Sequence, residues 1–161
     1  MLINQPTEGD GKMTRFERFT LILFEIMKDW NRIAGEIMKS EGLKATHALY
    51  LVTLDRYEEG ITSARLKEIC QKDKAEISRS LATLEKHGLV YKEETNNTRY
   101  NAKIKLTPDG KELADRLNRI ADNAVLHASH DLSEPEREIM YKCLSSIAEN
   151  LHQTASEDLL S

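Results

Sequence analysis

One segment of eighteen residues, DKAEISRSLATLEKHGLV at 73–90, restricts the possible folds of this chain more than any other. Its apolar residues recur at helical spacing and would form one stripe, Ile77, Leu81 and Leu84. Asp73 is a helix-capping residue, and Glu76 stands at the capping-box position three residues later. Gly88 ends the helix, and the pattern then changes to the alternation of a strand. The segment therefore predicts a short capped helix followed directly by a strand.

The outward face of this helix carries small residues interleaved with positive charge, Ala75, Arg79, Ala82 and Lys86. A helix face that only meets water usually presents mixed and bulkier polar residues. The small residues would instead let the helix backbone approach a partner closely. A solvated face stays open as the alternative for Arg79 and Lys86.

The net charge of −4 hides an uneven distribution along the chain. Residues 61–105 contain ten Lys and Arg against six Asp and Glu, whereas the rest of the chain contains thirteen bases and twenty-one acids. A polyanion such as DNA would be attracted by the middle segment and repelled by the remainder. We therefore expect any nucleic-acid contact to be confined to the middle of the chain.

The length and composition are those of a globular protein. A chain of 161 residues is close to the usual size of one domain, and no apolar run approaches the roughly twenty residues of a membrane span. The first twelve residues lack the pattern of a secretory signal, and two distant cysteines do not form a disulfide framework. These features predict a cytoplasmic protein that does not enter a membrane.

The pattern along the chain predicts four helices, a hairpin and two further helices. The hairpin strands would flank the polar loop TNNTRYN at 95–101. Thr107 and Pro108 would restart a helix as its N-cap and first residue, and Ser133 with Glu136 forms another capping box. The fold class is thus mainly α with a small β-hairpin wing, a winged helix-turn-helix domain between long dimerisation helices.

The domain boundaries follow from these elements. The outer helices have more apolar surface than one small core requires, which indicates dimerisation. We expect a flexible segment at 1–13, an N-terminal dimerisation helix at 14–44, the winged helix-turn-helix domain at 45–107, C-terminal dimerisation helices at 108–152 and a tail at 153–161.

Such a domain would place its second helix in the major groove of double-stranded DNA. The candidate DNA-binding residues are Lys72, Lys74, Ala75, Ser78, Arg79, Ala82, Lys86, Asn97 and Arg99. The lysines would contact phosphates. Arg79 could contact either guanine or a phosphate, and the sequence leaves that choice open. Arg99, near the hairpin tip, would enter a narrow minor groove.

These segments resemble the MarR family of bacterial transcription regulators over about residues 14–151. The resemblance is carried by DKAEISRSLATLEKHGLV, by the wing NNTRYNAKIKLTPDG and by the flanking long helices. It implies a homodimer, built from the first and last helices, that binds a pseudo-palindromic operator as a repressor and responds to a small-molecule effector. The family commonly has Asp two residues before the wing arginine, where this chain has Asn97.

The resemblance also suggests where an effector would bind, between the dimer helices and the DNA-binding part. The candidate pocket residues are Met27, Trp30, His47 and Tyr50. Aromatic and methionine side chains at helical spacing are also common core residues, and that alternative stays open.

Three other functions compete with a regulator of this kind. His127 and His130 lie one helical turn apart and could serve a metal-responsive regulator, with Cys143 or His152 as a distant third ligand. A winged helix could also bind protein rather than DNA. An enzyme is not expected, because the sequence has no Gly-rich phosphate loop, no HExxH and no nucleophile elbow. No cofactor or resident metal is expected either.

Overall fold

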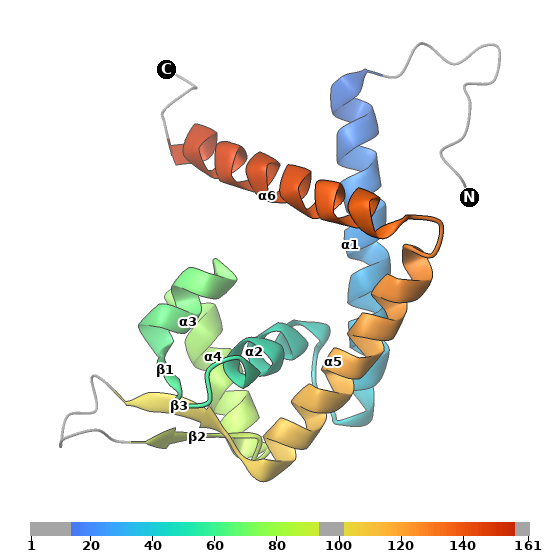
Figure 1. Ribbon diagram of the computed structural model, residues 1–161. Helices are drawn as coiled ribbons and strands as arrows, with labels where there is room; N and C mark the ends of the chain where they lie inside the picture. Colours follow the sequence, from blue (N-terminus) through green and yellow to red (C-terminus); the bar gives the residue numbers. More distant parts are fainter. Residues whose placement is uncertain (1–13, 94–101, 157–161) are drawn as a thin grey trace. The chain divides into compact units, whose positions relative to one another are not determined.

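The computed structural model describes residues 14–93 and 102–156 (Figure 1). The elements follow in the order α1 (Arg15–Ser40), α2 (Ala45–Asp55), β1 (Ile61–Thr62), α3 (Ser63–Cys70), α4 (Lys74–Lys86), β2 (Val90–Glu93), β3 (Lys103–Leu106), α5 (Pro108–Ala128) and α6 (Glu134–Ser156). The chain divides into two compact units, Met1–Asn118 and Arg119–Ser161, and their boundary lies within α5. The predicted fold class is confirmed. Within the described ranges, every helix is too short or too polar to span a bilayer.

Helices of the first unit begin at capping residues. The Thr62 hydroxyl accepts a hydrogen bond from the Arg65 N–H at 3.2 Å and so caps α3. The Thr107 hydroxyl accepts one from the Gly110 N–H at 3.1 Å and donates to the Gly88 carbonyl at 2.6 Å. The predicted helix restart at Thr107 is therefore confirmed, and this residue also attaches the start of α5 to the turn after α4.

The sheet has three antiparallel strands in the order β1-β3-β2. Val90 pairs with Leu106 in the predicted hairpin, and Ile61 pairs with Ile104 along the other edge of β3. The sequence predicted the hairpin but not this third strand. Two residues are too few to show the alternation of a strand, and their partner lies far along the chain.

The core of the first unit joins the end of α1 to the three helices that follow. Its largest fully buried side chains are Met38, Tyr50, Leu51, Leu66 and Leu84. They come from α1, α2, α3 and α4, and Figure 1 shows α2, α3 and α4 beside the sheet. Because one apolar cluster contains residues of all four helices, α3 and α4 are held in a fixed relation to each other.

The second unit contains the end of α5 and all of α6. Glu136 Oε2 accepts hydrogen bonds from the Ser133 N–H at 2.7 Å and from the Ser133 hydroxyl at 2.6 Å, so the Glu136 side of the predicted capping box is present, whereas the Ser133 hydroxyl donates to Glu136 and does not cap a backbone N–H. The hydroxyl and the N–H of Ser133 lower the pKa of Glu136. The helix continues to Ser156, past the predicted end of the helical region at residue 152.

Candidate nucleic-acid interface

The helix-turn-helix is formed by α3, a tight turn and α4. Gln71 ends α3 in the left-handed region with φ 49°, and Asp73 begins the next helix two residues later. The Asp73 carboxylate accepts a hydrogen bond from the Glu76 N–H at 2.8 Å, and this bond lowers the pKa of Asp73. The negative charge also lies at the positive end of the helix dipole. The cap therefore fixes where α4 starts.

The two faces of α4 differ as the sequence predicted. Ile77, Leu81 and Leu84 are buried in the core. The candidate contact residues on the helix are all exposed: Lys74, Ala75, Ser78, Arg79, Ala82 and Lys86. A helix with this outer face can approach a partner closely, because its exposed positions include two alanines and a serine. Their contact with DNA stays a prediction.

The cations of this unit fall into two groups. Lys74, Arg79 and Lys86 form no ion pair with any residue of the described ranges. By contrast, Lys92 Nζ lies 2.8 Å from Glu85 Oε2, and Lys105 Nζ lies 2.9 Å from Glu93 Oε2. Lys74, Arg79 and Lys86 are therefore available to an outside anion such as a phosphate, as is the exposed Lys67 of α3, which also has no ion pair within the described ranges.

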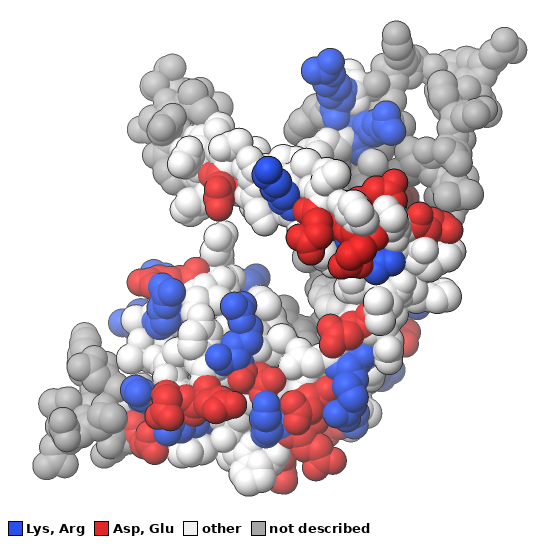
Figure 2. Space-filling model, viewed as in Figure 1, with Lys and Arg blue, Asp and Glu red and all other residues white. Residues whose placement is uncertain are grey.

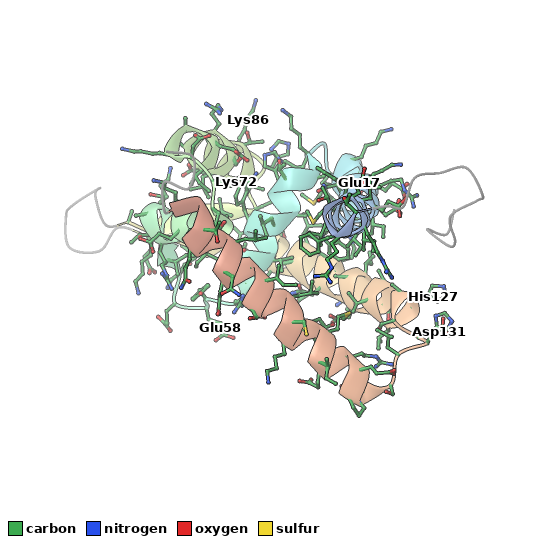
Figure 3. The ribbon with its side chains drawn as sticks, turned by 90° about the horizontal axis from the view of Figure 1, so that it is seen from above. Glu17, Glu58, Lys72, Lys86, His127 and Asp131 are labelled. Carbon is green, nitrogen blue, oxygen red and sulfur yellow. The ribbon has the colours of Figure 1, made fainter. Side chains whose placement is uncertain are left out.

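The unpaired cations of α4 give its outer face a local positive character. Lys86 lies at the outer edge of α4 in Figure 3. On the face of the molecule shown in Figure 2, acidic and basic side chains alternate. The side of the molecule seen in Figure 2 is therefore mixed in charge, and a basic DNA-binding surface on α4 stays a prediction.

The base of the wing is tied to α4. The ion pair between Lys92 of β2 and Glu85 of α4 joins the hairpin to the helix, and the pair between Lys105 and Glu93 crosses the two strands. Val90 at the start of β2 is buried. Asn97 and Arg99, the candidate wing contacts, lie outside the described residues.

Glu76 is used differently from the sequence prediction. Its side chain does not return to the start of the helix as a capping-box partner. Glu76 Oε1 instead accepts a hydrogen bond from the Tyr50 hydroxyl of α2 at 3.0 Å. The same oxygen lies 3.6 Å from Lys72 Nζ, so Lys72 is the one candidate phosphate contact that has an internal ion pair within the described ranges.

The four candidate pocket residues lie in two environments. Met27 and Trp30 are exposed on α1. His47 is buried at the start of α2, where its Nδ1 accepts a hydrogen bond from the Lys44 N–H at 3.1 Å. Tyr50 is fully buried and donates to Glu76. The two buried side chains thus already have hydrogen-bonding roles, and an effector pocket stays a prediction.

The histidine pair of the second unit has a geometry of its own. The rings of His127 and His130 are stacked with centroids 6.0 Å apart. His130 Nε2 lies 3.1 Å from Asp131 Oδ1, and Figure 3 shows His127 and Asp131 side by side. Within residues 14–93 and 102–156, no group of three His, Cys, Asp or Glu side chains could hold a metal ion. A metal-responsive regulator would need a third ligand from elsewhere.

Comparison with protein families agrees with this geometry. A model of the MarR family matches residues 41–99, which begin directly after α1 and include α2, β1, α3, α4 and β2. A search of curated proteins found no match.

Solved structures show the same fold. A Listeria monocytogenes protein described as a MarR-family transcriptional regulator, in complex with a 26mer DNA, has a TM-score of 0.77 at 24% identity, covering 84% of this chain and 89% of that chain. The S. aureus MepR-DNA complex has a TM-score of 0.73 at 20% identity, covering 82% and 97%. A MarR transcriptional regulator from Methanosarcina mazei has a TM-score of 0.74 at 19% identity, covering 91% and 96%. At these identities the likeness establishes the fold.

Proposed function

We propose that this chain is a transcription regulator of the MarR family, whose model matches residues 41–99, and that it binds an operator in duplex DNA as a homodimer and represses transcription there. The observation that carries the proposal is the outer face of α4. Three of its cations, Lys74, Arg79 and Lys86, are exposed and have no ion-pair partner within the described ranges. Cations that a protein leaves unpaired on a narrow helix face suit the phosphates that border a DNA groove.

In this proposal, α4 enters the major groove with its first turns at the base edges. The groove is about 12 Å wide and admits one helix. Ala75 and Ala82 allow close approach, Ser78 can exchange hydrogen bonds with either type of base, and Arg79 lies between them. The wing would add the contact of Arg99 in the adjacent minor groove.

The homodimer is supported by apolar side chains that a single chain leaves exposed. On α1 these are Leu21, Ile22, Phe24, Ile26, Met27 and Trp30, and on α6 they are Ile139, Tyr141, Leu144, Ile147 and Leu151. Scattered apolar residues are normal on a surface, but successive turns of two long helices form stripes that favour burial against a second copy. A two-fold dimer would present two copies of α4 about 34 Å apart, one turn of DNA.

An effector is proposed to act near the ends of this dimer surface. Met27 and Trp30 are exposed in the single chain, so they could contact either the second copy or a small apolar molecule. Soaking candidate aromatic acids and amines and recording Trp30 fluorescence would test this. A saturable change that also weakens DNA binding would support an effector site, and no change with any ligand that releases DNA would exclude Trp30 from it.

The DNA-binding proposal is tested by titrating the protein against duplex DNA at increasing salt. The wild-type protein is expected to bind a random-sequence duplex at low salt and to lose affinity steeply as salt rises. Arg79→Ala should reduce the slope by about 1 if Arg79 contacts a phosphate, or weaken an enriched operator by about 1 to 3 kcal/mol if it reads guanine. Arg32→Ala, which removes an exposed arginine of α1, is the matched control and should change neither quantity.

The wing is tested in the same assay. Arg99→Ala should weaken operator binding by about 1 to 3 kcal/mol, and unchanged affinity would remove the wing from the proposed mechanism. Absence of DNA binding by the wild-type protein at low salt would exclude the regulator. That result would favour the alternative that the winged helix binds another protein. The affinity for such a protein partner should not change in Arg79→Ala.

A further inference from the structure

Glu76 is an acidic residue in the first turn of α4, whose exposed residues include the unpaired cations Lys74, Arg79 and Lys86. Its carboxylate is half-buried and lies between two partners from different parts of the chain. On one side it accepts the hydrogen bond of Tyr50 from α2, and on the other it faces Lys72 from the turn before α4. A carboxylate next to DNA phosphates is costly, so its place here requires a reason.

The Tyr50 side of this contact is built into the core. Tyr50 is fully buried, and its only polar atom is the hydroxyl that reaches Glu76 at 3.0 Å. Burial, followed by the hydrogen bond to Glu76, raises the pKa of Tyr50 to about 12. The phenol therefore keeps its proton and remains a donor at every physiological pH. Because the ring cannot move without disturbing the core, it holds the Glu76 carboxylate in one position.

The Lys72 side of the contact is an ion pair near the surface. Lys72 Nζ lies 3.6 Å from Glu76 Oε1, and both side chains are about one-third exposed, at 36% and 30%. A pair this exposed contributes little to stability. It does, however, neutralise a cation that stands at the edge of the proposed DNA-binding face. A phosphate must compete with Glu76 before it can bind Lys72.

We propose that Tyr50 and Glu76 are positioning residues for DNA binding: Tyr50 anchors the first turn of α4 through Glu76, and Glu76 holds Lys72 back from phosphates. The proposal rests on the proposed function, since it concerns the same DNA-binding helix. It assigns to Glu76 a role other than helix capping, and to Tyr50 a role that does not require an effector.

Two conservative substitutions separate the two parts of the proposal. Tyr50→Phe removes only the hydroxyl, so it releases Glu76 but leaves its charge and the ion pair with Lys72. Glu76→Gln keeps an oxygen that can accept from Tyr50 but removes the charge that holds Lys72. Tyr50→Phe leaves the half-exposed Glu76 carboxylate open to water, so the variant is expected to fold.

The experiment measures binding to two DNA probes over a range of salt. One probe is a random-sequence duplex, and the other is a duplex enriched from a random pool by the wild-type protein. The control variant is Glu112→Gln, which makes the same change in net charge at an exposed acid of α5 that has no ion pair in the described part of the chain. Thermal unfolding of every variant verifies that it folds.

Tyr50→Phe is expected to weaken binding to the enriched duplex by about three- to tenfold, with no change on the random duplex and no change in salt slope. Glu76→Gln is expected to tighten binding to the random duplex and to steepen its salt slope by about 1, because Lys72 then displaces one more counterion. Glu112→Gln should leave the slope unchanged.

Three outcomes would overturn the proposal. If Glu76→Gln and Glu112→Gln behave alike, Glu76 acts only through net charge. If Tyr50→Phe weakens both probes equally, or neither, Tyr50 does not position the reading face. In both cases the wild-type protein still binds DNA, so the proposed function stands. If the wild-type protein binds neither probe, the proposed function fails together with this proposal.

Discussion

At the scale of single residues, His47 shows how a buried side chain couples this domain to pH. Its Nδ1 accepts a hydrogen bond from the Lys44 N–H, which only a ring with an unprotonated Nδ1 can do. Burial lowers the pKa of His47 below its ordinary value of 6.5, and the positive charges of Lys44 and His87 lower it further. The folded protein thus favours the neutral imidazole.

The lowered pKa of His47 predicts a loss of stability in mild acid. Between the folded and unfolded pKa values the unfolded chain binds more protons, so the free energy of unfolding rises with pH there. The contribution of His47 is complete above about pH 6.5 and is lost as pH falls through the lowered pKa. Urea unfolding at about pH 7.5 and about pH 5 should show a smaller loss for His47→Gln than for the wild-type protein.

The matched control for this prediction is His127→Gln, which removes an exposed histidine of the second unit. It should leave the difference between the two pH values as in the wild-type protein. An equal loss of stability in His47→Gln and the wild-type protein would contradict the role given to His47.

Single residues of the interface differ in how well the sequence predicted them. The buried stripe of Ile77, Leu81 and Leu84 was predicted because helical spacing is a local property. The contact between Tyr50 and Glu76 was missed because the two residues are 26 positions apart and neither carries a local sign of the other. The position of Glu76 in the sequence predicted that its side chain would bond to the backbone at the start of α4. In the fold, its side chain instead accepts the hydrogen bond of Tyr50.

At the scale of elements, the start of α5 depends on a close approach of two backbones. Thr107 places Gly110 directly over the turn after α4, where the Thr107 N–H donates to the Leu89 carbonyl at 3.1 Å. A Cβ on Gly110 would lie 2.9 Å from the carbonyl carbon of Leu89 and closer still to its oxygen. Any side chain at this position would therefore require α5 or the Leu89 backbone to shift.

Gly110→Ala is expected to destabilise the protein, although alanine is the better helix former. The added methyl group must push α5 away from the Leu89 backbone, which should cost about 1 to 3 kcal/mol in the free energy of unfolding. Gly35→Ala in α1 is the control, because a Cβ there would meet Ala45 at an ordinary 3.7 Å. That substitution should stabilise the protein by about 0.5 to 1 kcal/mol. Urea unfolding of both variants measures the difference, and equal effects would contradict the close approach.

The elements themselves were largely predictable because their signals are short in range. Capping residues marked the starts of α4 and α5, and Gly88 marked the end of α4. The strand β1 was missed, since two residues pair with β3 only after the chain has returned from the wing. Such pairing is decided by the fold of the unit and not by the residues of the strand.

At the scale of the whole molecule, the proposal depends on a second copy of the chain. Both α1 and α6 carry large apolar side chains that are exposed in the single chain. One winged helix offers only a few unpaired cations, which is little for tight operator binding. Doubling that surface by two-fold symmetry would account for both observations.

Phe24→Glu is expected to convert a dimer into a monomer. Phe24 is 67% exposed in the single chain, so a charge there should disturb the chain's own fold little but oppose burial against a copy. Leu49→Glu on α2 is the control, since Leu49 is also exposed, at 47%, but lies outside the proposed dimer helices. Sedimentation velocity should show a monomer for the first variant and a dimer for the second. A monomeric wild-type protein would contradict the proposed assembly.

The sequence indicated the whole-molecule properties through charge and surplus apolar surface. The basic middle segment predicted that α4 would contact DNA, which stays a prediction, and three unpaired cations of this segment are exposed on α4. The sequence did not predict which cations of the middle segment form ion pairs within the protein. The acidic partners of Lys72, Lys92 and Lys105 depend on tertiary contacts.

The most direct test of the central claim is to select bound duplexes from a random DNA pool with the full-length protein. A dimer that reads DNA with two copies of α4 should enrich an inverted repeat whose half-sites are centred about 10 base pairs apart. Arg79→Ala should lose or relax that motif. Enrichment of no motif, or of a single unrepeated half-site, would contradict the account.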